Sequence, residues 1–276
     1  MPYVPTRRGR ERILVMGDQG TGKSATVLSI VLGCPQSWVD VIDTDYNWEV
    51  MADGAPENLR IHEIDDDDFP GLLAKIREAS KGATRDDWLV LDSITPSFLA
   101  CQEHYVKITF GMSYEAFAQK ARKEMDNEKK ALQLFEGFKD WNVINPMYFE
   151  LYKLLMKYPG HVLCIAEAKD LGAQDEKDPE LMHVFGRIGR KPAGQKGMPY
   201  KFHTIIYMIQ KGREKYAFSN IKDRESLEYT REKVSAREMT KYGFVKDYLV
   251  AIAGWKFEKP KRVVQDEDAV AELERL

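Results

Sequence analysis

The chain has 276 residues, of which 43% are hydrophobic and 31% are charged, and its formal net charge is −3. A chain of this size can bury about 75% of the surface that its unfolded form exposes, so a core needs neither disulfides nor a structural metal. We expect no membrane protein and no secretory signal, because no apolar run reaches the ~18 residues of a membrane span and none follows the N-terminal arginines.

The first predicted elements are a strand, a glycine-rich turn and a helix. Arg12–Met16 is typical of a buried parallel strand, and Ala25–Leu32 is typical of a helix. The residues between them fit the pattern of a phosphate-binding loop, a Gly, four residues and Gly-Lys-Ser: Gly17, Asp18, Gln19, Gly20, Thr21, Gly22, Lys23 and Ser24. In such a loop, backbone N–H groups at a helix N-terminus converge on phosphates. The sequence therefore predicts a nucleoside triphosphate site from Gly17 to Ala25.

Strands and helices alternate along the rest of the chain. Predicted strands occupy five apolar runs: Trp38–Thr44, Trp88–Leu91, His161–Ala166, Phe202–Ile209 and Lys215–Ile221. Helices are predicted over Phe69–Ala79 and from Asn145-Pro146 onward, an N-cap followed by proline at the first helical position. Lys211-Gly212-Arg213 is typical of a hairpin turn. This order predicts an α/β fold, a mostly parallel sheet with helices on both faces and a late antiparallel hairpin.

Two segments lie outside a minimal nucleotide-binding core. Gly111–Asp140 is charged, with apolar residues at helical spacing, which predicts an amphipathic helix or helix pair within an insertion at about 100–140. Segment 169–201 has little strand or helix signal, and from Leu181 onward it is basic without one acidic residue. A loop of that length is usually functional or disordered. The chain is then divided into a basic N-terminal arm (1–11), a nucleotide-binding domain (12–255) and a charged C-terminal tail (256–276).

Carboxylates follow three of the predicted strands. Asp92 ends one of them and is the expected Mg²⁺ ligand beside the Ser24 hydroxyl, while Lys23 would contact the β- and γ-phosphates. Hydrolysis also needs a group that orients or deprotonates water. Asp45 and Glu167 are the two candidates for this base, and we favour Asp45. The scattered cysteines (Cys34, Cys101, Cys164) predict reduced thiols in a cytoplasmic compartment.

Together these motifs resemble the RecA/DnaB-type class of P-loop ATPases, most closely the single-domain RecA-like (Sak-type) recombination and annealing proteins of phages. Beyond the phosphate loop, the resemblance rests on the following stretches: Val41–Asp45, Leu89–Thr95, Trp141–Asn145, His161–Ala166, Gly197–His203 and Ile221–Arg224. It implies a RecA-like fold, ATP as the nucleotide, Mg²⁺ as the metal and, for a phage protein, the cytoplasm of a bacterial host.

The resemblance also implies roles for single residues. Asp45 stands where the class usually has a catalytic Glu, and Glu167 stands where it often has a Gln or His that senses the γ-phosphate. A carboxylate at Glu167 would repel that phosphate, so either Glu167 is the true base or hydrolysis is slow. Lys222 and Arg224 are similar to basic residues that enter a neighbouring subunit's ATP site, which implies a homo-oligomer with sites at subunit interfaces.

Three functions remain open from the sequence. Our leading hypothesis is a Mg²⁺-dependent ATPase of phage-type DNA recombination, repair or replication. Its partner would be single-stranded DNA, bound by the basic loop and by its base-stacking candidates Phe185, Met198 and Tyr200. The first alternative is an ATP-dependent regulator or accessory factor without direct DNA contact, for which the loop is a solvated or oligomer-contacting segment. The second is a small-molecule kinase with a mobile lid.

Overall fold

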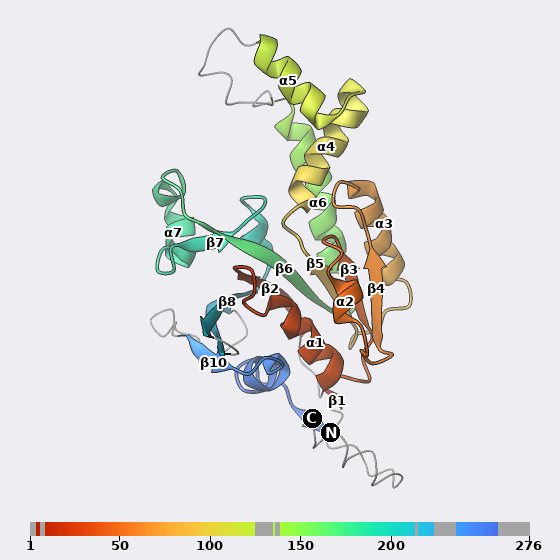
Figure 1. Cartoon of the computed structure of the whole chain (residues 1–276), viewed down its shortest axis with the longest axis vertical. Helices are drawn as coiled ribbons and strands as arrows, with labels where there is room; N and C mark the ends of the chain where they lie inside the picture. Colours follow the sequence, from red (N-terminus) through yellow and green to blue (C-terminus); the bar gives the residue numbers. More distant parts are fainter. Residues whose placement is uncertain are drawn as a thin grey trace.

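A computed structural model describes residues 4–5, 9–124, 135, 139–212, 215–223 and 236–258. A nine-stranded sheet forms the centre, in the order β10-β9-β8-β2-β6-β5-β3-β4 with β7 added to β6 (Figure 1). Its strands are β2 (Arg12–Gly17), β3 (Val39–Asp43), β4 (Leu59–Glu63), β5 (Trp88–Asp92), β6 (His161–Asp170), β7 (Arg190–Pro192), β8 (Thr204–Gly212), β9 (Lys215–Asp223) and β10 (Arg237–Met239). A separate pair joins β1 (Val4–Pro5) to β11 (Phe257–Glu258).

The six strands β2, β3, β4, β5, β6 and β8 run parallel, while β7, β9 and β10 are antiparallel to their neighbours. The strand β2 lies in the middle, between β6 and β8, and its last residue Gly17 is aligned with Glu167 and Met208. Strands buried on both faces read as continuous apolar runs, which is why the sequence predicted all the parallel strands except the partly exposed β4. The predicted α/β fold with a mostly parallel sheet and a late hairpin is confirmed.

Helices cover both faces of this sheet. They are α1 (Lys23–Gly33), α2 (Trp48–Met51), α3 (Phe69–Ala79), α4 (Ser97–Phe110), α5 (Tyr114–Glu124), α6 (Trp141–Lys157), α7 (Pro179–Phe185) and the π-helix η4 (Phe244–Val250). Because side chains alternate along a strand, Ile13 and Val15 of β2 pack in the layer of α1 and η4. Leu14 and Met16 pack in the layer of α3, α4 and α6. Figure 1 shows α4 and α5 extending beyond the sheet.

The helix predicted to begin at Asn145-Pro146 begins one turn earlier. In the structure α6 starts at Trp141 and contains Pro146 in its interior. Proline lacks the N–H that would bond to the carbonyl four residues before it, which normally disfavours this position. The earlier start buries Ile144 completely and stacks the Trp141 ring on Phe98, with 6.2 Å between ring centroids. The predicted start was wrong because this packing outweighs the missing bond.

Segment 169–201 is also more ordered than its composition predicts. The strand β6 continues to Asp170, and the segment then forms the short turn η1 (Asp175–Lys177), α7, β7 and the short turn η2 (Met198–Lys201). Asp178 caps α7 by accepting hydrogen bonds from the N–H groups of Glu180 and Leu181. Leu181 and Phe185 are buried in the core. The expectation of a loop without strand or helix was therefore wrong.

The helical expectation for Gly111–Asp140 is met by α5 as far as Glu124. Of residues 125–138, only Phe135 is described, and its buried ring packs against Phe117 and Trp141. In the described part of the chain, no helix combines the length and apolar character that crossing a membrane would require.

Candidate nucleotide-binding site

The predicted phosphate loop joins the end of β2 to the start of α1. Gly20 and Gly22 have φ angles of 76° and 86°, a left-handed conformation that side-chain-bearing residues rarely adopt. A Cβ atom on Gly22 would lie 3.2 Å from the Tyr216 ring, and one on Gly17 would lie 2.6 Å from the Thr21 hydroxyl oxygen. The glycines are therefore required by the turn itself. They leave the loop backbone exposed above the N-terminus of α1, the place where an α/β protein binds phosphate.

The Lys23 side chain is held inside this loop. Its Nζ donates hydrogen bonds to the carbonyl oxygens of Gly17 (3.0 Å) and Asp18 (2.8 Å). An ammonium group has three donors, so these bonds leave one donor for a phosphate oxygen. Burial lowers the pKa of Lys23, and four carboxylates oppose that effect: Asp92, Glu167, Asp18 and Asp45. The structure thus brings every predicted carboxylate of the site within electrostatic range of this ammonium.

Ser24 and Asp92 meet as the proposed metal ligands. The Ser24 hydroxyl donates to Oδ2 of Asp92 over 2.9 Å, and the indole N–H of Trp48 donates to the same oxygen over 2.9 Å. Burial raises the pKa of Asp92, while the two hydrogen bonds lower it. Among the described residues, no three His, Cys, Asp or Glu side chains gather as metal ligands. Mg²⁺ suits such a site, because it commonly takes one or two protein oxygens and completes its shell with phosphate and water.

Asp45 lies on an exposed turn that Asp43 organises. The buried carboxylate of Asp43 accepts the N–H groups of Asp45 (3.1 Å) and Trp48 (2.9 Å), so it fixes the turn between β3 and α2. The Thr44 hydroxyl lies 3.2 Å from Oδ1 of Asp45 and accepts the N–H of Ser93, the residue after Asp92. Burial raises the pKa of Asp45, and the hydrogen bond from Thr44 opposes the rise. Asp45 is thus held beside the end of the strand that carries Asp92.

Glu167 lies on β6, directly beside the phosphate loop. It is aligned with Gly17, its N–H donates to the Thr95 hydroxyl over 3.0 Å, and its carbonyl accepts the N–H of Ala193 over 2.8 Å. These contacts fix the backbone and leave the side chain exposed. Glu167 on β6 and Asp45 after β3 lie on the same side of β2 and within electrostatic range of Lys23, so both remain candidates for the base.

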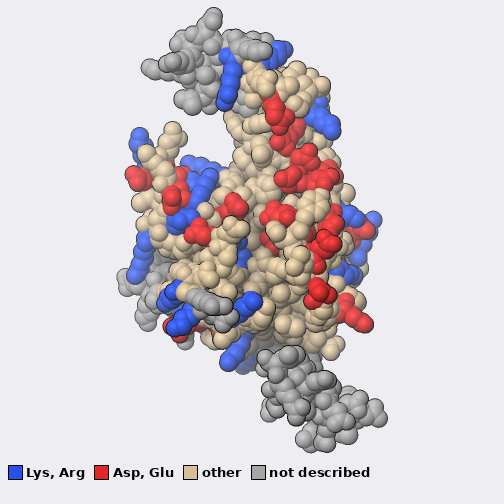
Figure 2. All heavy atoms as spheres, viewed as in Figure 1, with Lys and Arg blue, Asp and Glu red and all other residues tan. Residues whose placement is uncertain are grey.

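Four of the five Lys and Arg side chains of segment 181–201 contact acidic or aromatic groups of their own chain. Arg190 contacts Asp18 and Asp170, Lys191 pairs with Asp175, Lys196 pairs with Asp178, and Lys201 lies over the ring of Phe149. Figure 2 shows Lys and Arg interspersed with acidic side chains over α7 and β7. Three of the five Lys and Arg side chains of this segment, Arg190, Lys191 and Lys196, are therefore paired with carboxylates of the same chain.

The two residues predicted to act in a neighbouring subunit differ in what the structure describes. Lys222 lies near the end of β9 and is aligned with Ile205 of β8, which is aligned with Leu14 of β2. It therefore lies toward the end of the sheet that is opposite the phosphate loop. Its Nζ donates to the carbonyl oxygens of Phe202 (2.5 Å) and Pro199 (3.2 Å). Arg224 lies outside the described residues.

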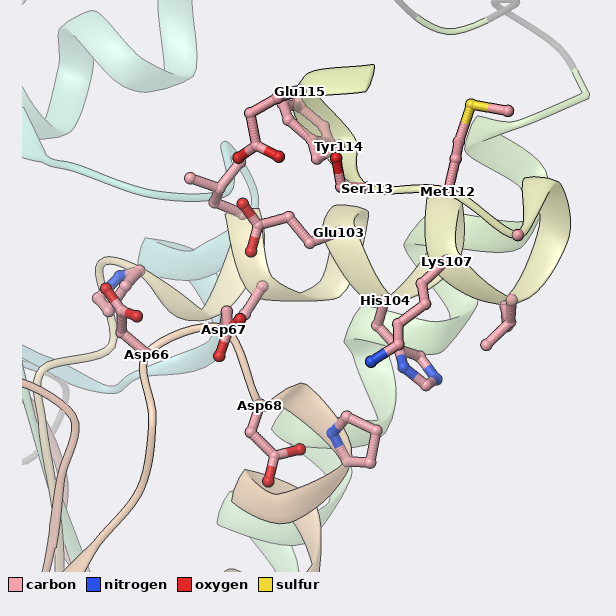
Figure 3. A pocket seen from close by; sticks show the side chains of 16 residues that line it. Asp66, Asp67, Asp68, Glu103, His104, Lys107, Met112, Ser113, Tyr114 and Glu115 are labelled. Atoms are coloured by element: carbon pink, nitrogen blue, oxygen red, sulfur yellow. The ribbon is translucent and has the colours of Figure 1, made fainter. Parts of the chain in front are cut away.

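A separate hollow of about 830 Å³ lies along α4 and the start of α5, beside Asp66–Asp68. Figure 3 shows Glu103 and Glu115 on the same side of it as Asp66 and Asp67. Burial raises the pKa of Glu103, and those three carboxylates add to the rise. No residue of the loop from Gly17 to Ser24 lines this hollow. Because its walls are acidic, it would repel phosphate, and the phosphate loop remains the candidate nucleotide site.

Comparisons with known proteins add only distant structural likeness. No protein-family model matches the sequence, and no curated protein is similar to it. Among solved structures, the crystal structure of the RadB recombinase is similar over 87% of this chain and 90% of that chain, with 14% identity and a TM-score of 0.45. A likeness of this degree assigns no function to the chain.

Proposed function

We propose that this protein is a Mg²⁺-dependent ATPase of the RecA-like type that acts on single-stranded DNA in recombination, repair or replication. The observation that carries the ATPase proposal is the arrangement at the end of β2. There, the loop-held ammonium of Lys23 lies beside a Ser24 hydroxyl that is bonded to Asp92. Strand, phosphate loop, lysine and hydroxyl–carboxylate pair are the parts that phosphoryl transfer from a nucleotide requires. ATP rather than GTP rests on the sequence resemblance.

Each residue would have a defined task in hydrolysis. Lys23 would offset charge on the β- and γ-phosphates, and the loop N–H groups would hold the same oxygens. Ser24 and Asp92 would hold Mg²⁺, which when bound neutralises phosphate charge. Asp45 would take the proton from the attacking water, because its raised pKa brings its basicity closer to neutral pH than that of an ordinary carboxylate. Glu167 is the alternative for this last task.

Two substitutions test the ATPase proposal. Lys23→Ala should abolish ATP binding or hydrolysis, and Asp92→Asn should retain part of the affinity while losing Mg²⁺-dependent turnover. Calorimetric titration with ATP and a phosphate-release assay measure the two effects. Lys75→Ala, which removes only a solvent-exposed pair with Glu78 on α3, is the control. Wild-type turnover in either site variant would refute the assignment.

Binding of single-stranded DNA is proposed from the basic segment and tested separately. Its Lys191 and Lys196 are paired with acids, so a strand would have to exchange these partners. Replacing Arg187, Lys191 and Lys196 by Ala should weaken binding of a labelled oligonucleotide and reduce its salt slope by about 0.7 per lost phosphate contact. The matched control replaces Lys75, Arg77 and Lys153 on α3 and α6. ATP binding should survive both triple changes.

The same ion pairs favour the second candidate function, an ATP-dependent regulator without direct DNA contact. Compensated basic side chains present little net positive charge to a nucleic acid. If the wild-type protein binds ATP but fails to bind the oligonucleotide at low salt, with and without ATP, the regulator is the better description.

We also propose a homo-oligomer in which Arg224 and Lys222 act on the ATP site of the next subunit. Nothing in the sheet order brings Lys222 to its own phosphate loop, which supports a role between subunits. Arg224→Ala and Lys23→Ala should each be nearly inactive alone, and mixing them should restore part of the activity. Wild-type turnover of Arg224→Ala alone would refute the proposal.

A further inference from the structure

Arg190 brings a positive charge to the phosphate loop from an element far along the chain. Its Nη2 lies 2.5 Å from Oδ1 of Asp18, the second residue of the loop, and 3.1 Å from the carbonyl oxygen of Ala168. Its Nε forms an ion pair with Asp170 at 3.1 Å. The guanidinium therefore lies beside the phosphate loop of its own chain.

The backbone holds Arg190 at this place. It begins β7, which is aligned antiparallel with the end of β6, so Arg190 lies opposite Asp170. The Leu171 N–H donates to the Gly189 carbonyl, and the Ala193 N–H donates to the Glu167 carbonyl. The strand β7 is thus bonded on both sides of Arg190 to the strand that carries Glu167. A movement of the Arg190 side chain would therefore act on β7, which is bonded to the part of β6 that carries Glu167.

Asp18 makes this contact unusual for a phosphate site. Its carboxylate is half-exposed on the loop, and its carbonyl oxygen accepts the hydrogen bond from Lys23. A triphosphate in the loop adds negative charge beside this carboxylate, which raises the free energy of the complex unless a cation offsets it. A terminal phosphate also competes with Asp18 for Arg190, because a guanidinium binds carboxylate and phosphate in the same two-donor geometry.

We propose that Arg190 binds the terminal phosphate within its own subunit, exchanging Asp18 for it when a triphosphate occupies the loop. This inference rests on the proposed ATPase function and adds to it a residue that distinguishes triphosphate from diphosphate. The exchange moves Arg190 relative to Asp170, so it transmits the presence of the terminal phosphate to β7 and the segment behind it. Arg190 acts in cis, separately from the proposed role of Arg224 between subunits.

The first measurement is the affinity for ADP and for a non-hydrolysable ATP analogue, by calorimetry. Arg190→Ala removes a charge-assisted contact. The affinity for the analogue should therefore fall by about 10- to 100-fold, and the affinity for ADP should fall by less than about threefold. Arg190→Lys should recover part of the loss, because it keeps the charge without the planar fork. Lys75→Ala is the control, since it removes only a solvent-exposed pair with Glu78 on α3.

A double variant separates contact with phosphate from mere neutralisation of Asp18. If Arg190 binds the phosphate, the loss caused by Arg190→Ala persists in an Asp18→Asn background. If Arg190 only neutralises Asp18, the Asp18→Asn change restores the affinity, and the proposal is overturned. Equal losses for ADP and the analogue in the single variant would also overturn it.

Hydrogen exchange gives a readout that is independent of affinity. In the wild type, amide exchange across residues 186–197 should differ between the protein saturated with the analogue and the protein saturated with ADP. This difference should vanish in Arg190→Ala. A wild-type segment that exchanges identically in both nucleotides overturns the transmission. A wild-type protein that binds neither nucleotide overturns the ATPase proposal itself, so the two failures are distinguishable.

Discussion

Replacing Trp48 by Phe tests how the fold holds the carboxylate of Asp92. The indole is fully buried, and its N–H lies 2.9 Å from Oδ2 of Asp92. Trp88 provides a matched control, because it is equally buried and its indole N–H has no hydrogen-bond partner among the described residues. Each Trp→Phe change removes the same atoms and keeps an aromatic ring, which at position 88 preserves the stacking on His161.

The expected difference follows from these contacts. Losing a hydrogen bond to a charged group costs about 1.5–3 kcal/mol, whereas removing an unpaired buried donor relieves about 1–3 kcal/mol. With comparable packing losses, Trp48→Phe should be less stable than Trp88→Phe by at least about 1.5 kcal/mol in free energy of unfolding. Urea denaturation followed by far-ultraviolet circular dichroism measures the free energy of unfolding of both variants. The comparison is valid if this free energy depends equally steeply on urea concentration in the two variants.

The pH dependence of this difference has a definite sign. Burial raises the pKa of Asp92, and the Trp48 N–H opposes the rise by stabilising the carboxylate. Trp48→Phe should therefore raise that pKa further. The extra destabilisation should be complete above the pKa of the folded variant and should shrink as the pH falls through it. Equal stability of the two variants at neutral pH would refute the reasoning.

Four other substitutions have defined outcomes. Gly22→Ala should weaken nucleotide binding, measured by calorimetry, because φ is 86° and an aromatic ring lies 3.2 Å from the new Cβ; Gly54→Ala is the control, since its φ is 73° and its Cβ would meet open space. Asp92→Asn should raise the melting temperature at neutral pH, because the pKa of Asp92 is raised in the folded protein and its negative charge therefore lowers stability at pH values above that pKa. The gain in melting temperature should disappear as the pH falls through the pKa of Asp92. Asp45→Asn and Glu167→Gln should differ, the base variant losing about 10²-fold or more in kcat while binding ATP normally, as phosphate release and calorimetry report. Equal small effects would contradict both assignments.

The phosphate loop and five of the six parallel strands were predictable because each has a local signal. The loop has fixed residue types at fixed spacing, and each strand is a short apolar run that is buried on both faces. The β4 strand was missed because it is only partly buried at the sheet edge and carries Arg60 and His62, which bind the buried Asp40. Its charged side chains conceal the strand pattern.

The contacts around the candidate site were harder to predict because they join distant parts of the chain. No spacing rule brings Trp48 to Asp92 or Arg190 to Asp18; the sheet order does. One local signal was available, since Asp178-Pro179 is an N-cap followed by proline at the first helical position, and it marks the start of α7. That signal would have reduced the length assigned to the loop.

The central place of β2 has a consequence for how the protein is made. This strand is among the earliest parts of the domain to be synthesised, yet its two neighbours in the sheet, β6 and β8, end at Asp170 and Gly212. At ribosomal rates of about 5–20 residues per second, the strand waits roughly 10–40 s for its second partner. During that time its apolar edges lack their final neighbours, so the nascent chain should depend on chaperones more than the finished protein does. Completion of the candidate nucleotide site is thus a late step in the synthesis of the chain.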